Sequence, residues 1–241
     1  MGCIAVIHVA LLLLLAGVGK LAKADDTNSV FNPCSDTLVQ KSDGFTFGVT
    51  FAARDSFYSN TVEYSPCDSR LGLSASHLAV FRPKVDEITL LTINTTAGSF
   101  SPEQDGGYMV AFAGHNHAAR STPTFVANQT LIITSFTLVL DFNKGRLQNL
   151  FWKTDGCNSC QGKSSFVCYR GQSCAIKLSD CKNKGGSVDC SLGIQLAFSG
   201  TDKHDSVFNS WYEISNLRQY SLFGLYSNLK NSLTSQYGKY F

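Results

Sequence analysis

The feature that most constrains this chain is a two-residue alternation of apolar and polar side chains that recurs along most of its length. At residues 45–51 one side is Phe, Phe, Val and Phe, and the other is Thr, Gly and Thr. Successive side chains of a β-strand point to opposite faces, so the pattern predicts a strand with one buried face. Similar patterns predict strands at 78–81, 87–93, 108–112, 131–142, 147–152 and 192–198.

The longest predicted strand, 131–142, is apolar on both sides, which is typical of a central strand covered on both faces. Asn143-Lys144-Gly145 follows it and offers a tight hairpin turn back to 147–152. Short strands joined by turns rich in Gly, Ser and Asn predict a mainly β fold, an antiparallel sandwich or jelly roll. The tail after Trp211 is ambiguous, and we expect a short helix near 221–233.

The first residues predict a secretory signal peptide. An apolar run between Val9 and Val18 is shorter than the roughly 20 residues that span a bilayer, and Ala22-Lys23-Ala24 resembles a cleavage site. We expect a signal peptide at 1–24, a single domain at 25–241 and no integral membrane segment after cleavage.

Charge excludes one class of partner. The 20 basic side chains fall to 18 when Lys20 and Lys23 leave with the signal peptide, and this number equals that of the acidic side chains, 18. A balanced chain gives no reason to expect nucleic acid as a partner.

Cysteine usage supports export. Removal of Cys3 turns nine cysteines into eight, an even number that predicts four disulfides in an oxidising compartment. We expect one bridge between Cys34 and Cys67. Three more bridges are expected within a disulfide-rich excursion at 157–190, which holds Cys157, Cys160, Cys168, Cys174, Cys181 and Cys190. Six cysteines allow 15 connectivities, and the spacing selects none of them.

Two other interpretations of the cluster are weaker. Cys157-Asn-Ser-Cys160 has the spacing of a redox pair, but turn residues flank it instead of a strand followed by a helix. A zinc site would need a second closely spaced pair, and the other gaps are wider.

Asn94-Thr-Thr and Asn128-Gln-Thr match the acceptor pattern for N-linked glycans, so both asparagines are expected to carry them.

His115-Asn116-His117 is the one local arrangement with metal-ligand character, because residues two apart on an extended segment face the same way. A third ligand would have to come from a distant residue such as His77, Asp141 or His204. We therefore expect His115 and His117 to be loop residues rather than ligands, and we expect no bound metal or cofactor.

No nucleophile elbow, phosphate-binding loop, dinucleotide fingerprint or zinc-protease motif occurs in the sequence. No pair of carboxylates stands out as the pair that a glycosidase needs. We therefore identify no catalytic residue and favour a protein that is not an enzyme. Aromatic side chains offer another route to binding, because rings stack on sugar faces. Residues 211–241 hold Trp211, Tyr212, Tyr220, Tyr226, Tyr237 and Tyr240.

Phe31-Asn-Pro-Cys-Ser-Asp36, Tyr64-Ser-Pro-Cys-Asp68, the stretch 106–117 and the clustered cysteines together give the chain a recognisable layout. This layout resembles a group of plant secreted proteins of the Expp type, and the resemblance covers nearly all of the mature chain. It implies residence in the apoplast, the cell wall or the endomembrane lumen, and it implies no activity.

The sequence as a whole favours a secreted, non-catalytic binding or cell-wall-associated module. Extracellular polysaccharide or glycoprotein is the leading type of partner. A secreted hydrolase with a convergent site and a structural wall protein are the alternatives.

Overall fold

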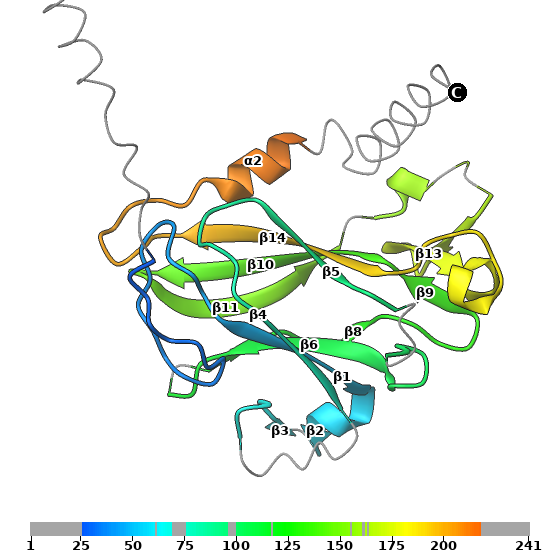
Figure 1. Ribbon diagram of the computed structural model, residues 1–241, viewed down its shortest axis with the longest axis horizontal. Coiled ribbons are helices and arrows are strands. Elements are labelled where there is room, and N and C mark those ends of the chain that lie inside the picture. The colour runs from blue at the N-terminus through cyan, green and yellow to red at the C-terminus, as the bar shows by residue number, and fades with distance from the viewer. Residues whose placement is uncertain are drawn as a thin grey trace, which may run out of the picture.

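A computed structural model describes residues 26–217, except 61, 69–75, 96–99, 117, 155, 161 and 163. Two layers of β-strands lie face to face, with a disulfide-rich region at one end and a short helix on the outer side of one layer (Figure 1). The predicted fold class, mainly β with a disulfide-rich excursion, is therefore confirmed.

One layer is a five-stranded antiparallel sheet. Its order is β4 (His77–Phe81), β1 (Phe47–Ala53), β6 (Gly107–Ala113) and β7 (Ala119–Arg120), and β8 (Thr124–Phe125) also pairs with β6. A small hairpin of β2 (Tyr58–Ser59) and β3 (Val62–Glu63), which follows the 3-10 helix η1 (Arg54–Phe57), lies beside this layer (Figure 1).

The other layer is a four-stranded sheet with the order β11 (Arg146–Lys153), β10 (Ser135–Asn143), β14 (Leu192–Gly200) and β5 (Thr89–Ile93). One pair departs from the expected antiparallel pattern, because β10 and β14 are parallel. The chain between them includes β11 and the whole disulfide-rich excursion, so it is long enough to return β14 in the same direction as β10.

The predicted strand at 131–142 is two strands. β9 (Leu131–Ile133) belongs to a three-stranded sheet of order β12 (Phe166–Tyr169), β13 (Ser173–Lys177) and β9, and β10 starts only at Ser135. Between them, the carbonyl of Thr134 accepts a hydrogen bond from Gly193 N at 2.7 Å. The alternation of apolar and polar side chains continues through this break, because β9 and β10 both bury side chains in the same core.

The prediction that this segment is covered on both faces is confirmed for β10. Leu138 and Leu140 face the other layer, and Val139 on the opposite face is only 1% exposed. Val139 packs with Ala197 and with Ile214 of α2 (Ser210–Leu217), the short helix on the outer side of the sheet (Figure 1). The expected helix near 221–233 lies outside the described residues.

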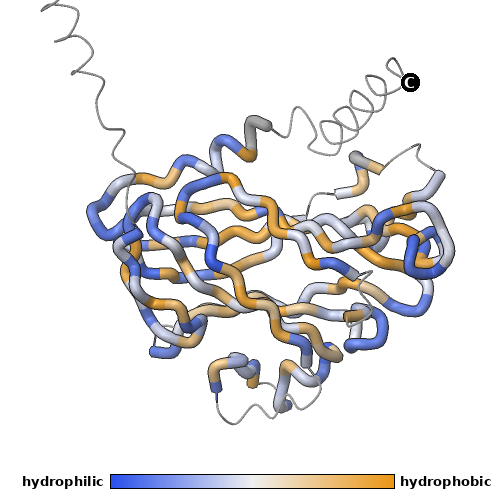
Figure 2. The backbone as a smooth tube through the Cα atoms, in the orientation of Figure 1, coloured by the Kyte–Doolittle hydropathy of each residue, from blue (hydrophilic) through white to orange (hydrophobic). Residues whose placement is uncertain are grey.

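The main core fills the space between the layers and extends into the disulfide-rich region. Figure 2 shows apolar segments along the strands of both layers and polar colour in many of the connecting loops. Ala175, Ile176, Leu178, Cys181 and Cys190 belong to the same buried cluster as the sandwich strands. The excursion, which includes η2 (Asn158–Cys160), η3 (Leu178–Asp180) and η4 (Lys182–Lys184), is thus packed onto the sandwich.

All eight expected cysteines form disulfides. Cys34 pairs with Cys67, as predicted, and the other three bridges lie within the cluster. The structure selects one of the 15 connectivities: Cys157–Cys168, Cys160–Cys174 and Cys181–Cys190. Both cysteines of the C-x-x-C segment are bonded to the β12–β13 hairpin, where Cys168 and Cys174 are opposite each other. Neither of the two is a free thiol.

Candidate functional site

The histidine segment lies where β6 ends, next to an N-terminal loop. The carboxylate of Asp36 accepts hydrogen bonds from the backbone N–H groups of His115 and Asn116, each at 2.9 Å. Gly114 N also donates to Pro33 O at 2.8 Å. His115 is therefore a loop residue, and His117 lies outside the described residues.

The described histidines do not converge on one point. The His77 ring lies 3.0 Å from a carboxylate oxygen of Asp105, and the His204 ring is 3.2 Å from the side-chain oxygen of Gln40. Among the residues that the structure describes, no three His, Cys, Asp or Glu side chains are grouped so that they could hold a metal ion.

A shallow pocket opens beside the Asp36 loop, and its volume of about 10 Å³ has room for about one water molecule. Its floor is apolar and its rim is polar; the lining residues are Ser35, Asp36, Thr37, Phe45, Ala113, Gly114, Arg146 and Leu147. Ligand pockets are typically about 300–1,000 Å³. A ligand at this end therefore has to lie across the surface, because the pocket is too small to take up a sugar ring.

The β10–β11 turn supplies Arg146. Lys144 and Gly145 have φ angles of 50° and 74°, the left-handed conformation that a tight hairpin needs and that the sequence predicted here. The N-terminal segment runs against this turn, with Val39 N donating to Gly145 O and Lys203 N donating to Val39 O, each at 2.9 Å. Three segments far apart in the sequence thus meet at this end of the sandwich.

Two buried carboxylates hold these segments in place. Asp43 accepts hydrogen bonds from Thr27 N at 2.8 Å and from Gln40 N at 2.9 Å. Asp202 accepts them from the backbone N–H groups of Ser206, His204 and Lys41. Burial opposes ionisation of Asp202, but these three donors outweigh it and hold the pKa of its carboxyl below the ordinary value. Both carboxylates therefore hold the backbone of the surrounding loops in place.

Phe31 is an exposed ring on the same N-terminal segment, 67% accessible to solvent. The guanidinium of Arg82 lies 4.1 Å from the ring centroid and covers one face. Arg82 is itself held by Thr46 Oγ1 at 2.9 Å and by Asp26 at 2.6 Å. Phe31 and Ser35 of the pocket are four positions apart in the chain, a span of at most about 14 Å.

The predicted aromatic group is described only in part. Tyr212 is 65% exposed on α2, and half-buried Trp211 lies beneath the ammonium of Lys153, which is 4.4 Å from its ring centroid. The other tyrosines of that group lie outside the described residues. The structure therefore leaves the proposed aromatic platform of the C-terminal tail as a prediction.

Asn128 is exposed in a turn in which its side-chain oxygen accepts hydrogen bonds from Thr130 N and Leu131 N. Asn94 is exposed at the end of β5, while Thr96 of its acceptor pattern lies outside the described residues. Exposure suits both asparagines to carry a glycan, and their glycosylation stays a prediction.

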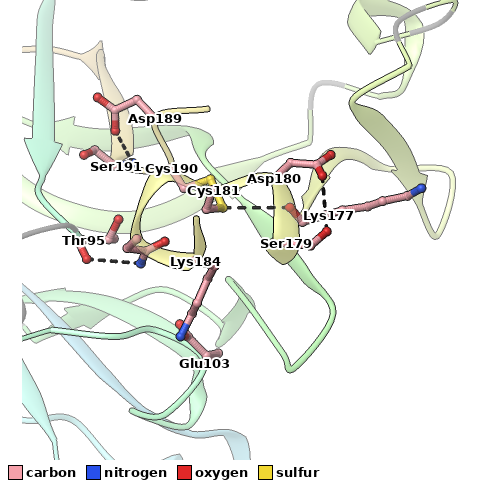
Figure 3. The surroundings of a disulfide bond; sticks show 11 residues. Thr95, Glu103, Lys177, Ser179, Asp180, Cys181, Lys184, Asp189, Cys190 and Ser191 are labelled. Atoms are coloured by element: carbon pink, nitrogen blue, oxygen red, sulfur yellow. Dashed lines mark hydrogen bonds and ion pairs between the residues drawn. A yellow bond between two sulfur atoms is a disulfide. The ribbon is translucent and has the colours of Figure 1, made fainter. Parts of the chain in front are cut away.

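An ion pair joins the disulfide-rich region to the five-stranded layer. In Figure 3, Lys184 of η4 extends from beside the Cys181–Cys190 disulfide to Glu103, whose side chain is 4% exposed. The two charged atoms are 2.9 Å apart, and Asn183 Nδ2 donates nearby to Thr95 O. Burial opposes ionisation of Glu103, but the side chains of Ser101 and Lys184 outweigh it and lower the pKa of the carboxyl.

We expect Lys184→Met to reduce the free energy of unfolding at pH 7 by about 1 kcal/mol, since it leaves a buried carboxylate without its cation while Lys184 itself is partly screened by solvent. A lowered pKa stabilises the fold above the ordinary value of 4.5, and this contribution is lost as pH falls through the lower folded pKa. The difference between the proteins should thus shrink at acidic pH.

Urea unfolding of both proteins between pH 7 and pH 3 measures this effect. Lys182→Met is the matched control, because Lys182 is an exposed residue of the same short helix. A loss that is equal for the two variants, or that does not change with pH, would contradict the assignment.

Fold and site together define a disulfide-stapled β-sandwich with a shallow, polar-rimmed pocket at one end. A family model described as "Uncharacterised protein DDB_G0273449" matches residues 3–132 and 121–235, and the chain belongs to that family. Searches of the curated proteins and of the solved structures return no match. No helix among the described residues is long and apolar enough to cross a membrane.

The sequence did not point to most of the residues at this site. Phe31, Ser35, Thr37, Arg146 and Lys203 lie in loops or at the end of a strand, where no periodic pattern singles them out. Two signals were available: the segment Phe31–Asp36, on which the resemblance partly rests, and the Lys144-Gly145-Arg146 turn, which places two cations on either side of a glycine.

Proposed function

We propose that this protein is an exported binding module whose ligand is a carbohydrate chain of an extracellular matrix or wall. Four disulfides favour an oxidising compartment outside the cytosol. The signal peptide expected at 1–24 agrees with this placement, although it lies outside the described residues.

The observation that carries the proposal is the exposed Phe31 ring next to a polar-rimmed pocket. An aromatic ring with one free face offers an apolar platform for the C–H face of a sugar. The rim supplies the hydroxyls of Ser35 and Thr37 and the guanidinium of Arg146, which can bond sugar oxygens. A sugar chain would lie across this surface, because the pocket itself has room for about one water molecule.

Carboxylates at this end give no support to hydrolysis. Asp43 and Asp202 are buried and accept backbone N–H groups, and Asp36 is bonded to the loop after β6. A general acid and a general base need carboxylates that are free to exchange protons with substrate or water. The arrangement thus favours binding over catalysis.

An array of immobilised polysaccharides tests the proposal. We expect the protein to be retained on a restricted set of glycans, and Phe31→Ala to weaken that retention by about two- to tenfold, the usual worth of an aromatic contact. Phe151→Ala is the control, since it removes a ring that is 40% exposed on β11 and that belongs to neither of the aromatic groups considered for sugar binding. A blank array, or equal losses for both variants, would refute the proposal.

A further inference from the structure

The strand β4 forms an open edge of the five-stranded layer. It pairs with β1 on one side, and no other strand of the described chain pairs with its second side. Phe45 N donates to Pro83 O at 2.9 Å, and hydrogen-bonded pairs alternate with non-bonded pairs along an antiparallel ladder. Counted from this pair, the backbone groups of Ala79 bond to β1. The N–H and C=O groups of Leu78 and Val80 therefore point to the open side.

Apolar side chains are exposed beside this edge. Leu78 is 58% exposed and Val80 is 49% exposed. Both point to the outer face of the layer, because Phe81 on the alternate side packs against the core between the layers. The five residues of β4 include no Lys, Arg, Asp, Glu or Pro, which are the residues that commonly protect an edge strand from pairing. The edge is therefore suited to accept another strand.

The other edge strands of the two layers are less suited to pairing. β11 begins with Arg146 and ends with Lys153, so it carries a cation at each end. β7 and β8 consist of two residues each. β5 exposes Leu90, which is 64% accessible, but Thr92 follows it on the same face. Only β4 combines an uncharged strand of several residues with two exposed apolar side chains on one face.

We infer that β4 pairs with β4 of a second copy of this chain, so that the five-stranded layers of two copies join into one sheet. Two identical strands can pair antiparallel about a two-fold axis, the commonest symmetry of soluble oligomers. With the axis at Ala79, Leu78 of each copy lies opposite Val80 of the other. This register uses the open N–H and C=O groups of both residues in four intermolecular hydrogen bonds, and it places two Leu–Val pairs on the outer face.

The charges near the two ends of β4 are compatible with this register. Arg82 pairs with Asp26 at 2.6 Å beyond one end, and His77 lies 3.0 Å from Asp105 at the other. The antiparallel arrangement brings the Arg82 end of one copy beside the His77 end of the other. The two Arg82 residues are then six positions apart along the paired strands, about 20 Å, so the two guanidinium groups do not meet.

The size of the contact sets its strength. A stable interface buries about 800 Å² on each partner, and β4 contributes only five residues. We therefore expect a weak dimer, with a dissociation constant on the order of 10–100 μM.

The dimer also joins two copies of the surface around Phe31. Arg82, whose guanidinium covers the Phe31 ring, follows Leu78 and Val80 at the same two-residue spacing and so points to the same outer face. The two-fold axis is perpendicular to the sheet, so both Phe31 rings lie on one face of the joined layer. This consequence rests on the proposed function: a sugar chain that reaches both surfaces is bound more tightly by the dimer than by the monomer.

Analytical ultracentrifugation of the exported protein without carbohydrate, between about 1 μM and about 500 μM, tests the inference. We expect the mean mass to rise with concentration toward twice that of the monomer. Val80→Lys should weaken the association about tenfold or more, because it places a cation opposite Leu78 of the other copy. Val62→Lys is the matched control: Val62 is 56% exposed on β3, next to Glu63, which pairs with Arg120 at the opposite side of the layer.

Ala79→Cys tests the register. At the axis, the two Ala79 Cα atoms form a non-hydrogen-bonded pair about 4.5 Å apart, a distance that a disulfide can bridge. We expect mild oxidation to give a covalent dimer, measured by electrophoresis without reductant. Val62→Cys, an exposed thiol away from the edge, should stay monomeric under the same conditions.

A monomer at every concentration, or equal association of the parent protein and Val80→Lys, would overturn the inference. Association that is lost in Leu90→Lys and kept in Val80→Lys would place the contact on β5 and would also overturn it. These results would leave the proposed function intact, because retention on the glycan array is measured separately. A blank array would refute the proposed function and leave the dimer intact.

Discussion

Phe142→Ala is expected to reduce the free energy of unfolding by about 3–5 kcal/mol, the range measured when a buried aromatic ring is deleted from a core. Phe142 is 3% exposed on β10 and has three aromatic neighbours. Its ring centroid is 5.2 Å from that of Phe45, 5.5 Å from that of Phe208 and 6.2 Å from that of Phe198. Deletion leaves a cavity that these three rings cannot fill without moving.

The loss should also reach the pocket, because Phe45 forms its floor and rests edge-on against Phe142. Chemical unfolding measures the stability, and glycan titration of the folded fraction measures the pocket. Phe151→Ala is the matched control: it is the same substitution on the adjacent strand, at a ring that is 40% exposed, and it should cost well under 1 kcal/mol. If the two variants lost a similar free energy of unfolding, the ring cluster around Phe142 would not be the core at the pocket end of the sandwich.

The second large effect is expected from Cys181→Ala/Cys190→Ala, which should cost about 2–5 kcal/mol. Both cysteines are buried in the main cluster, at 0% and 1% exposure, and they close a loop with a sequence separation of 9. The variant loses the constraint on the unfolded chain and, in addition, the packing of two buried sulfur atoms. The Glu103–Lys184 pair lies beside this bridge and should weaken with it (Figure 3).

The double variant Cys157→Ala/Cys168→Ala distinguishes the lost constraint on the unfolded chain from the lost packing of buried sulfur atoms. Its bridge closes a loop of similar separation, 11, but Cys168 is exposed and Cys157 only half-buried. Loop entropy alone predicts nearly equal losses for the two double variants. A larger loss for Cys181–Cys190, measured by thermal unfolding, would show that burial contributes. A smaller loss would contradict the packing described here.

Several elements followed directly from local pattern. The alternation at 45–51 marked the region of β1 because its period reflects only the pleat of a strand. Asn143-Lys144-Gly145 indicated the β10–β11 turn because few residues tolerate positive φ. The isolated position of Cys34 and Cys67 indicated their bridge. By contrast, β12 and β13 were missed, because short strands in a cysteine-rich stretch carry little periodic signal.

The break at Thr134 shows where local pattern fails. An uninterrupted alternation at 131–142 predicts one strand, yet β9 pairs with β13 and β10 pairs with β11 and β14. Alternation records only which side chains are buried, and both segments bury theirs in the same core. The change of sheet depends on which partner strand is nearby, which is a long-range property.

The candidate site depends on tertiary structure even more strongly. Phe31, Arg146 and Lys203 lie more than fifty residues apart in the sequence, and each alone is an ordinary loop residue or strand end. The fold brings them to one end of the sandwich through backbone hydrogen bonds from Val39 to Gly145 and from Lys203 to Val39. Buried Asp43 and Asp202 hold the adjoining loops in place.

The sequence by itself determined the β class, the approximate positions of the longer strands and the number of disulfides, because strand period, turn residues and cysteine parity are local or additive properties. Only the tertiary structure decided the parallel β10–β14 pair, the connectivity within the cysteine cluster and the meeting of the N-terminal segment with the β10–β11 turn. These features depend on which distant segments come into contact. The free energy of such contacts is shared among residues that no short stretch of sequence contains.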